Sequence, residues 1–220
     1  MNKQFELLVF DWDGTLMDSI EHISSSLAAA AADIDLVDLG AERYKGIIGL
    51  GLAEAMAELY PDADNDTQEA LCDRYRHHFL DSSKGSSSLF DGTHEMLTSL
   101  KEKGPKMAVA TGKARRGLNR VFDETGYHSM FHASRCADES GSKPDPKMLH
   151  EIMSELNITP EKALMIGDSR YDLQMANNAG IDCIAVSYGV HGCAELQQHK
   201  PLTCCENITE LSDWLHMHIE

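Results

Sequence analysis

The chain has 220 residues, of which 42% are hydrophobic and 25% are charged, and it carries a formal net charge of −17. This length and composition are typical of one large soluble globular domain, or of one domain with a smaller insertion. The acidic balance argues against a nucleic-acid binder and against a protein that docks on anionic membranes, because both need a basic face.

The lack of a long apolar segment and the spacing of the cysteines indicate the cellular compartment of the protein. No apolar stretch approaches the roughly 18 residues of a membrane-spanning helix, and the apolar run at 5–10 is too short for the core of a signal peptide. The six cysteines form no CxxC pair. We therefore expect a cytoplasmic protein with reduced thiols.

The first predicted strand covers residues 7–10, and a long helical region follows it. Residues 27–32, 52–59 and 68–80 have helical patterns, and no segment between 20 and 80 resembles a strand. Asp18, with Glu21 three residues later, is positioned to cap the first of these helices. The serine- and glycine-rich segment 82–88 is typical of a flexible linker. These patterns predict an all-helical cap domain over residues 17–86, inserted into a core formed by residues 1–16 and 87–220.

Strands and helices alternate in the rest of the chain. Short, nearly continuous apolar runs at 106–110, 163–166 and 183–186 predict strands that are covered on both faces, as in a parallel sheet. Helical patterns at 94–101, 118–122 and 147–156 lie between them. The fold class that we predict is α/β, with a Rossmann-like core built on a mostly parallel sheet.

Polar side chains follow the predicted strands at the edge where ligands bind in such sheets. Asp11 and Asp13 follow the first strand, and because they are two residues apart their carboxylates face the same side. Thr111 and Gly112 follow the second strand, and Asp168 follows the third. Clustered carboxylates would repel one another without a cation, and Mg²⁺ prefers oxygen ligands together with substrate phosphate. The pattern therefore predicts a magnesium site.

Four short motifs in this order resemble those of the haloacid dehalogenase-like hydrolases, in particular the phosphoglycolate phosphatase-like branch with a helical cap. They are DWDGT from Asp11, Thr111-Gly112, Lys143-Pro144, and GDSRYD, which contains Asp168 and Asp172. The resemblance spans residues 11–172. It implies a phosphatase for a small phosphorylated metabolite, with phosphoglycolate as the default substrate, acting as a monomer or homodimer with no nucleic-acid or membrane partner.

The resemblance also implies a role for each motif residue. Asp11 is expected to be the nucleophile that takes up the phosphoryl group, and Asp13 the general acid and base. Asp11 and Asp168, with the backbone carbonyl of Asp13, are expected to bind Mg²⁺. Thr111, Gly112 and Lys143 are expected to bind phosphate, and Asp172 to orient Lys143 or a water molecule.

Several alternatives remain open at this point. A sugar-phosphate mutase of the β-phosphoglucomutase type would share Asp11 and Asp13. A non-catalytic binding protein could share the fold, but it predicts the loss of at least one of Asp11, Asp13, Lys143 and Asp168, and all four are present. Asp172 could also be a simple first-turn acid of a helix. In the cap, Arg43 and Lys45 precede the glycine-containing loop GIIGLGL and are candidate substrate contacts, although a solvated helical surface is an equally good reading.

Overall fold

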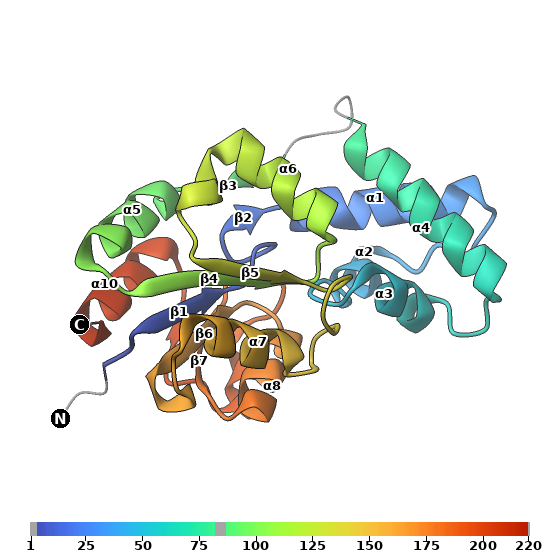
Figure 1. The fold of residues 1–220 in the computed structure, drawn as a ribbon. Helices are drawn as coiled ribbons and strands as arrows, with labels where there is room; N and C mark the ends of the chain where they lie inside the picture. Colours follow the sequence, from blue (N-terminus) through green and yellow to red (C-terminus); the bar gives the residue numbers. More distant parts are fainter. Residues whose placement is uncertain (1–3, 82–86, 220) are drawn as a thin grey trace.

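A six-stranded parallel sheet forms the centre of the protein in a computed structural model that describes residues 4–81 and 87–219 (Figure 1). The strand order is β5-β4-β1-β6-β7-β8, and each neighbouring pair is parallel. The four predicted strands are confirmed to within one residue at each end. The strands of this sheet are β1 Leu7–Phe10, β4 Lys106–Thr111, β5 Ala133–Cys136, β6 Ala163–Gly167, β7 Asp182–Val186 and β8 Cys204–Cys205.

Within this six-stranded sheet, the two strands that sequence patterning missed are the edge strands β5 and β8. The middle residues of β5, Ser134 and Arg135, are only partly buried, and β8 has two residues. An edge strand has one neighbour and little buried apolar surface, so its sequence carries no continuous hydrophobic run.

Helices cover both faces of the sheet, as the apolar strands predict. Leu8 and Phe10 belong to a core cluster with α5, α6 and α10, whereas Leu7 and Val9 belong to a second cluster with α7 and α8. Figure 1 shows α5 and α6 on one side of the sheet and α7 and α8 on the other. The core helices are α5 Thr93–Lys103, α6 Arg115–Thr125, α7 Lys147–Leu156, α8 Arg170–Ala179, α9 Cys193–Leu196 and α10 Ile208–His218, with 3-10 turns at Tyr127–Ser129, Pro160–Lys162 and Gln197–His199.

Four helices form the cap, and they lie together at one end of the sheet (Figure 1). They share their own buried apolar cluster, which includes Leu27, Tyr44, Met56 and Leu71. The predicted α/β core with a helical cap is therefore confirmed, while the exact boundaries of 17–86 stay a prediction. Residues 82–86 of the predicted linker lie outside the described residues. The cap helices are α1 Ile20–Asp33, α2 Ala41–Lys45, α3 Leu52–Leu59 and α4 Asn65–Leu80.

The chain leaves the core and returns to it along two short paired strands. β2 (Met17–Asp18) pairs antiparallel with β3 (Ser88–Leu89). Asp18 is thus part of a strand, and the prediction that it caps α1 is wrong. Ser19 precedes α1 instead, but its hydroxyl donates to Asp13 and accepts no hydrogen bond from the helix backbone.

The prediction of uniformly reduced thiols is also wrong. Cys193 and Cys204 form a disulfide, with their Cα atoms 5.9 Å apart, a spacing usual for such bonds. The other four cysteines are free and buried. Among residues 4–81 and 87–219, no helix combines the length and the apolar character needed to cross a membrane.

Trp12 provides a direct test of the core packing. It is fully buried, and its ring meets those of Phe122, Tyr127 and Phe131 edge-on at centroid distances of 5.3, 6.5 and 6.3 Å. Trp12→Ala leaves a cavity among these rings and should lower the free energy of unfolding by about 3–5 kcal/mol in urea denaturation. Val37→Ala, at a position that is 75% exposed, should change it by less than about 0.5 kcal/mol. A loss below about 1 kcal/mol for Trp12→Ala would contradict this packing.

Candidate active site

The carboxyl ends of the central strands bring together residues that are far apart in the sequence. Asp11 follows β1, Thr111 ends β4 and Asp168 follows β6, while Lys143 comes from the loop before α7. β1 lies between β4 and β6 in the sheet, so the first three residues occupy adjacent strand ends. All four residues are buried, with at most 1% of each exposed.

Lys143 joins two acids inside this group. Its Nζ lies 2.7 Å from Asp11 Oδ1 and 2.6 Å from Asp172 Oδ1. Asp172 sits in the first turn of α8, where its other oxygen accepts from the backbone N–H and the hydroxyl of Ser169 at 3.0 and 2.6 Å. This capping interaction explains why Asp172 points toward the strand ends, and its carboxylate in turn positions Lys143.

Asp168 is held by neutral donors. The hydroxyl of Thr15 donates to its Oδ1 at 2.8 Å, and the backbone N–H of Val190 donates to its Oδ2 at 2.8 Å. Gly14 has φ +80°, and a Cβ atom there would overlap the Asp168 carboxylate. A glycine is therefore required at this position of the DWDGT motif.

Asp13 faces a different partner set from Asp11. Its Oδ1 accepts from the hydroxyl of Ser19 at 2.5 Å and lies 2.9 Å from Nζ of Lys113. No described residue donates to its Oδ2. Trp12, between the two acids, points into the core, as expected for alternating side chains in an extended segment.

The pKa values of the buried acids are shifted because several carboxylates lie close together away from water. Burial raises the pKa of Asp11 well above its usual range, the charge of Asp172 raises it further, and Lys143 partly offsets both. Burial and the charge of Asp172 raise the pKa of Asp168 to about 7. Burial alone would lower the pKa of Lys143, but the carboxylates of Asp11 and Asp172 outweigh it and raise that pKa. The cluster holds more acidic groups than its lysine can balance.

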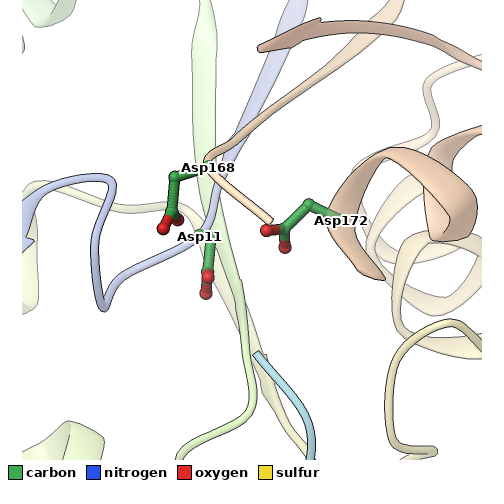
Figure 2. Close-up of side chains that lie close together, drawn as sticks. All are labelled: Asp11, Asp168 and Asp172. Atoms are coloured by element: carbon green, nitrogen blue, oxygen red, sulfur yellow. The ribbon is translucent and has the colours of Figure 1, made fainter. Parts of the chain in front are cut away.

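These acids fit a divalent cation. Asp11, Asp168 and Asp172 each offer an oxygen within 4.8 Å of the others, and Figure 2 shows Asp172 reaching from α8 toward the other two. Asp11 Oδ1 is buried, and its close partner among the described residues is the ammonium group of Lys143 at 2.7 Å. An oxygen-only donor set of this kind suits a hard cation. Asp172, predicted to act on Lys143 or water, thus lies nearer the possible ion than expected, while the side chain of Asp13 lies outside this trio.

A cavity of about 930 Å³ opens between these strand ends and the cap. Asp11, Asp13, Thr111 and Gly112 line it, whereas Lys143 reaches Asp11 from the protein interior. The Thr111 hydroxyl also accepts from the backbone N–H of Lys113 at 3.2 Å. The predicted phosphate-binding residues therefore converge on Asp11 from two sides.

The loop between α2 and α3 closes the cavity from the cap side. A Cβ atom on Gly112 would overlap the backbone oxygen of Leu50, and the backbone N–H of Gly51 donates to the hydroxyl of Ser142 at 2.8 Å. The glycine-containing loop that the sequence singled out thus lies directly against the core.

The two predicted cap contacts lie elsewhere. Arg43 pairs with Glu58 at 3.6 Å, Lys45 pairs with Glu21 at 3.1 Å, and neither lines the cavity. Lys113 and the apolar wall that the cap contributes to the cavity were not singled out by the sequence patterns. No sequence signal separates these apolar side chains from ordinary core positions, because both are spaced for burial in helices.

Comparison with known proteins adds an independent line of evidence. A family model described as haloacid dehalogenase-like hydrolase matches residues 8–186. A phosphoglycolate phosphatase of Psychrobacter arcticus is 28% identical, covering 98% of this chain and 96% of its own length. A 5′-nucleotidase of Pseudomonas aeruginosa is also 28% identical and covers 96% of each chain.

A solved structure agrees with these matches. The crystal structure of a predicted phosphatase from Clostridium acetobutylicum has a TM-score of 0.86 and 26% identity, covering 98% of this chain and all of that one. The family match includes every strand end that contributes to the cluster of Asp11, Lys143 and Asp168. The chain belongs to the haloacid dehalogenase-like hydrolase family.

Proposed function

We propose that the protein is a Mg²⁺-dependent phosphatase that hydrolyses small phosphate monoesters by way of a phosphoryl group carried on Asp11. The observation that carries this proposal is the placement of two carboxylates with different surroundings on one loop. Asp11 sits beside the buried cation Lys143 and the other acids, while Asp13 faces the cavity next to Lys113. The names of the relatives, a phosphoglycolate phosphatase and a 5′-nucleotidase, support hydrolysis of phosphate monoesters.

The proposed first step transfers the phosphoryl group to the protein. Asp11 attacks phosphorus through the carboxylate oxygen that faces away from Lys143, and the bond from phosphorus to the ester oxygen breaks. Asp13 gives a proton to that leaving oxygen. Lys143 and the hydroxyl of Thr111 stabilise the phosphoryl oxygens, which carry most of the charge during transfer.

The proposed second step returns Asp11 to its starting state. Asp13, now ionised, takes a proton from water, the water oxygen bonds to phosphorus, and the bond between phosphorus and Asp11 breaks to release inorganic phosphate. Asp11 and Asp168 would hold Mg²⁺, with Asp172 at its edge and the backbone carbonyl of Asp13 as a further ligand. When bound, the ion supplies positive charge that offsets the meeting of an anionic ester with an anionic carboxylate.

The choice of substrate and the fate of the phosphoryl group distinguish a phosphatase from a mutase. Phosphoglycolate remains the substrate suggested by family resemblance. A mutase would share both acids but would return the phosphoryl group to an isomeric ester, so inorganic phosphate and isomers are both followed in the assays. Net phosphate release supports the phosphatase, and isomer formation without phosphate release supports the mutase.

Removal of the nucleophile is the first test. Asp11→Asn should lower Mg²⁺-dependent hydrolysis of p-nitrophenyl phosphate by at least about 10³-fold, because the residue that accepts the phosphoryl group is lost. Asp62→Asn, an exposed change in the cap, serves as the matched control and should retain full activity. Activity of Asp11→Asn within about tenfold of the unmodified enzyme would refute the assigned role.

Removal of the proposed acid and base gives a different signature. p-Nitrophenol leaves without needing a proton, so Asp13→Asn should still phosphorylate Asp11 but should hydrolyse the product slowly. Rapid-mixing kinetics should show a burst of p-nitrophenol close to one equivalent per enzyme. Intact-mass measurement should then find one added phosphoryl group. A variant that turns over steadily without a burst or mass increase would contradict this role.

Binding of the metal should be visible without catalysis. At a Mg²⁺ concentration about a hundredfold above Kd, a ligand that binds only the folded state adds about 2.7 kcal/mol of stability. For a chain of this size that gain raises Tm by about 5–10 °C. In Asp168→Asn the Mg²⁺-dependent part of this shift should disappear, whereas Asp62→Asn should keep it. An equal shift in Asp168→Asn would show that the ion binds elsewhere.

A further inference from the structure

The wall that the cap contributes to the cavity is almost entirely apolar. It includes Ile23, Ile48, Leu52, Met56, Tyr75 and Phe79, drawn from α1, α3, α4 and the loop between α2 and α3. Among the described cap residues that line the cavity, Arg76 is the one charged side chain, and its guanidinium is paired with Asp73 at 2.7 Å. The surface that faces the substrate's leaving group therefore offers no unpaired cation.

Two of the cations on the core side of the cavity are held by carboxylates. Lys113 pairs with Asp13 at 2.9 Å and Arg115 with Glu139 at 2.7 Å. Arg120 lies 3.4 Å from Glu124, but its buried Nε makes no hydrogen bond with a described residue. Arg116 also lines the cavity, but it is exposed, and water weakens the attraction of such a charge for an anion. Charge on the substrate can be met on the core side, beside Lys113 and Arg120, whereas the cap wall offers no such partner and favours an apolar leaving group.

The size of the cavity also favours a leaving group that is larger and less polar than a two-carbon acid. A volume of about 930 Å³ is near the upper end of small-molecule sites, which are mostly apolar with a few placed polar groups. A two-carbon acid would leave most of the apolar wall in contact with water. Tyr75 and Phe79, whose rings lie 5.5 Å apart, add aromatic surface that favours flat rings.

The hydroxyl of Tyr75 is the polar group best placed to orient such a ring. Tyr75 is half-buried and lines the cavity, and its hydroxyl makes no hydrogen bond with a described residue. The hydroxyl is not one of the buried polar atoms that lack a partner, so it is open to the cavity. A ring nitrogen or an exocyclic oxygen of the substrate could take the place of water as its partner.

We infer that the leaving group of the substrate carries an aromatic or heteroaromatic ring, with the ring against the cap wall and its polar edge at Tyr75. This inference rests on the proposed phosphatase function and names the class of ester that the same site hydrolyses. Nucleoside monophosphates and simple aryl-alkyl phosphates share this chemistry, and the experiment separates them.

The test compares esters whose leaving groups are all alkoxides, so that differences in rate report recognition rather than the ease of bond breaking. Phosphoglycolate and glycerol 3-phosphate represent small polar leaving groups. Nucleoside 5′-monophosphates and 2-phenylethyl phosphate represent rings with and without a polar edge. The inference predicts that kcat/KM for at least one ring-bearing ester exceeds that for both small esters by about tenfold or more.

Two variants, with Val37→Arg as a control, test the assigned wall. Leu52→Arg places a cation on the apolar surface and should lower kcat/KM for ring-bearing esters about tenfold through KM, while raising it for phosphoglycolate. Val37→Arg adds the same charge at an exposed cap position outside the cavity and should change neither. Tyr75→Phe should lower kcat/KM about two- to tenfold for a nucleoside monophosphate and leave 2-phenylethyl phosphate unchanged.

The outcomes separate this inference from the proposed function. Hydrolysis of phosphoglycolate or glycerol 3-phosphate with kcat/KM equal to or above that of both ring-bearing esters would overturn the inference and leave the phosphatase standing. An unchanged substrate ratio in a folded Leu52→Arg variant would also overturn it. Absence of Mg²⁺-dependent hydrolysis of every ester would overturn the phosphatase proposal, and this inference with it.

Discussion

Three buried carboxylates share the strand ends with one buried lysine, and the negative charge left over is the constraint on which the rest of the site depends. Asp11, Asp168 and Asp172 lie within ligand distance of one another, and Lys143 contacts two of them. Charges removed from water are costly unless they are paired. Such a cluster is expected to be retained where a cation and an anionic ligand complete the balance. The same acids that destabilise the empty site through their mutual repulsion would therefore give it its affinity for a cation.

The fold holds these charged side chains in fixed positions. Asp11, Thr111 and Asp168 extend from strands that are buried on both faces, and Asp172 is fixed by its capping interaction with Ser169. The cap meets this rigid edge at a few points. Lys113 lies 2.9 Å from Asp13 and 5.0 Å from the ring centre of Phe79 in α4. Asp13, the acid that lines the cavity, is therefore linked to the cap through Lys113, and in the proposed reaction this would place leaving-group recognition beside proton transfer.

Much of this arrangement could be predicted from the sequence because it depends on local patterns. Continuous apolar runs identified β1, β4, β6 and β7, and the polar residues that follow such strands must meet at one edge of a parallel sheet. The remaining features depend on contacts between distant segments. The pairing of Cys193 with Cys204, the contact of Lys113 with Asp13, and the placement of Arg43 and Lys45 away from the cavity are set by tertiary packing. The apolar residues of the cavity wall have the same spacing as core residues, so pattern alone could not reveal them.

The central claim is that the carboxylate cluster is a cation site that includes the nucleophile. Crystals grown with Mn²⁺ in place of Mg²⁺, measured at the manganese absorption edge, test it most directly because the anomalous signal locates the ion. The account predicts a single strong peak bound by carboxylate oxygens of Asp11 and Asp168, next to Asp172. A peak elsewhere, or no peak at these acids while the ion binds in solution, would contradict it.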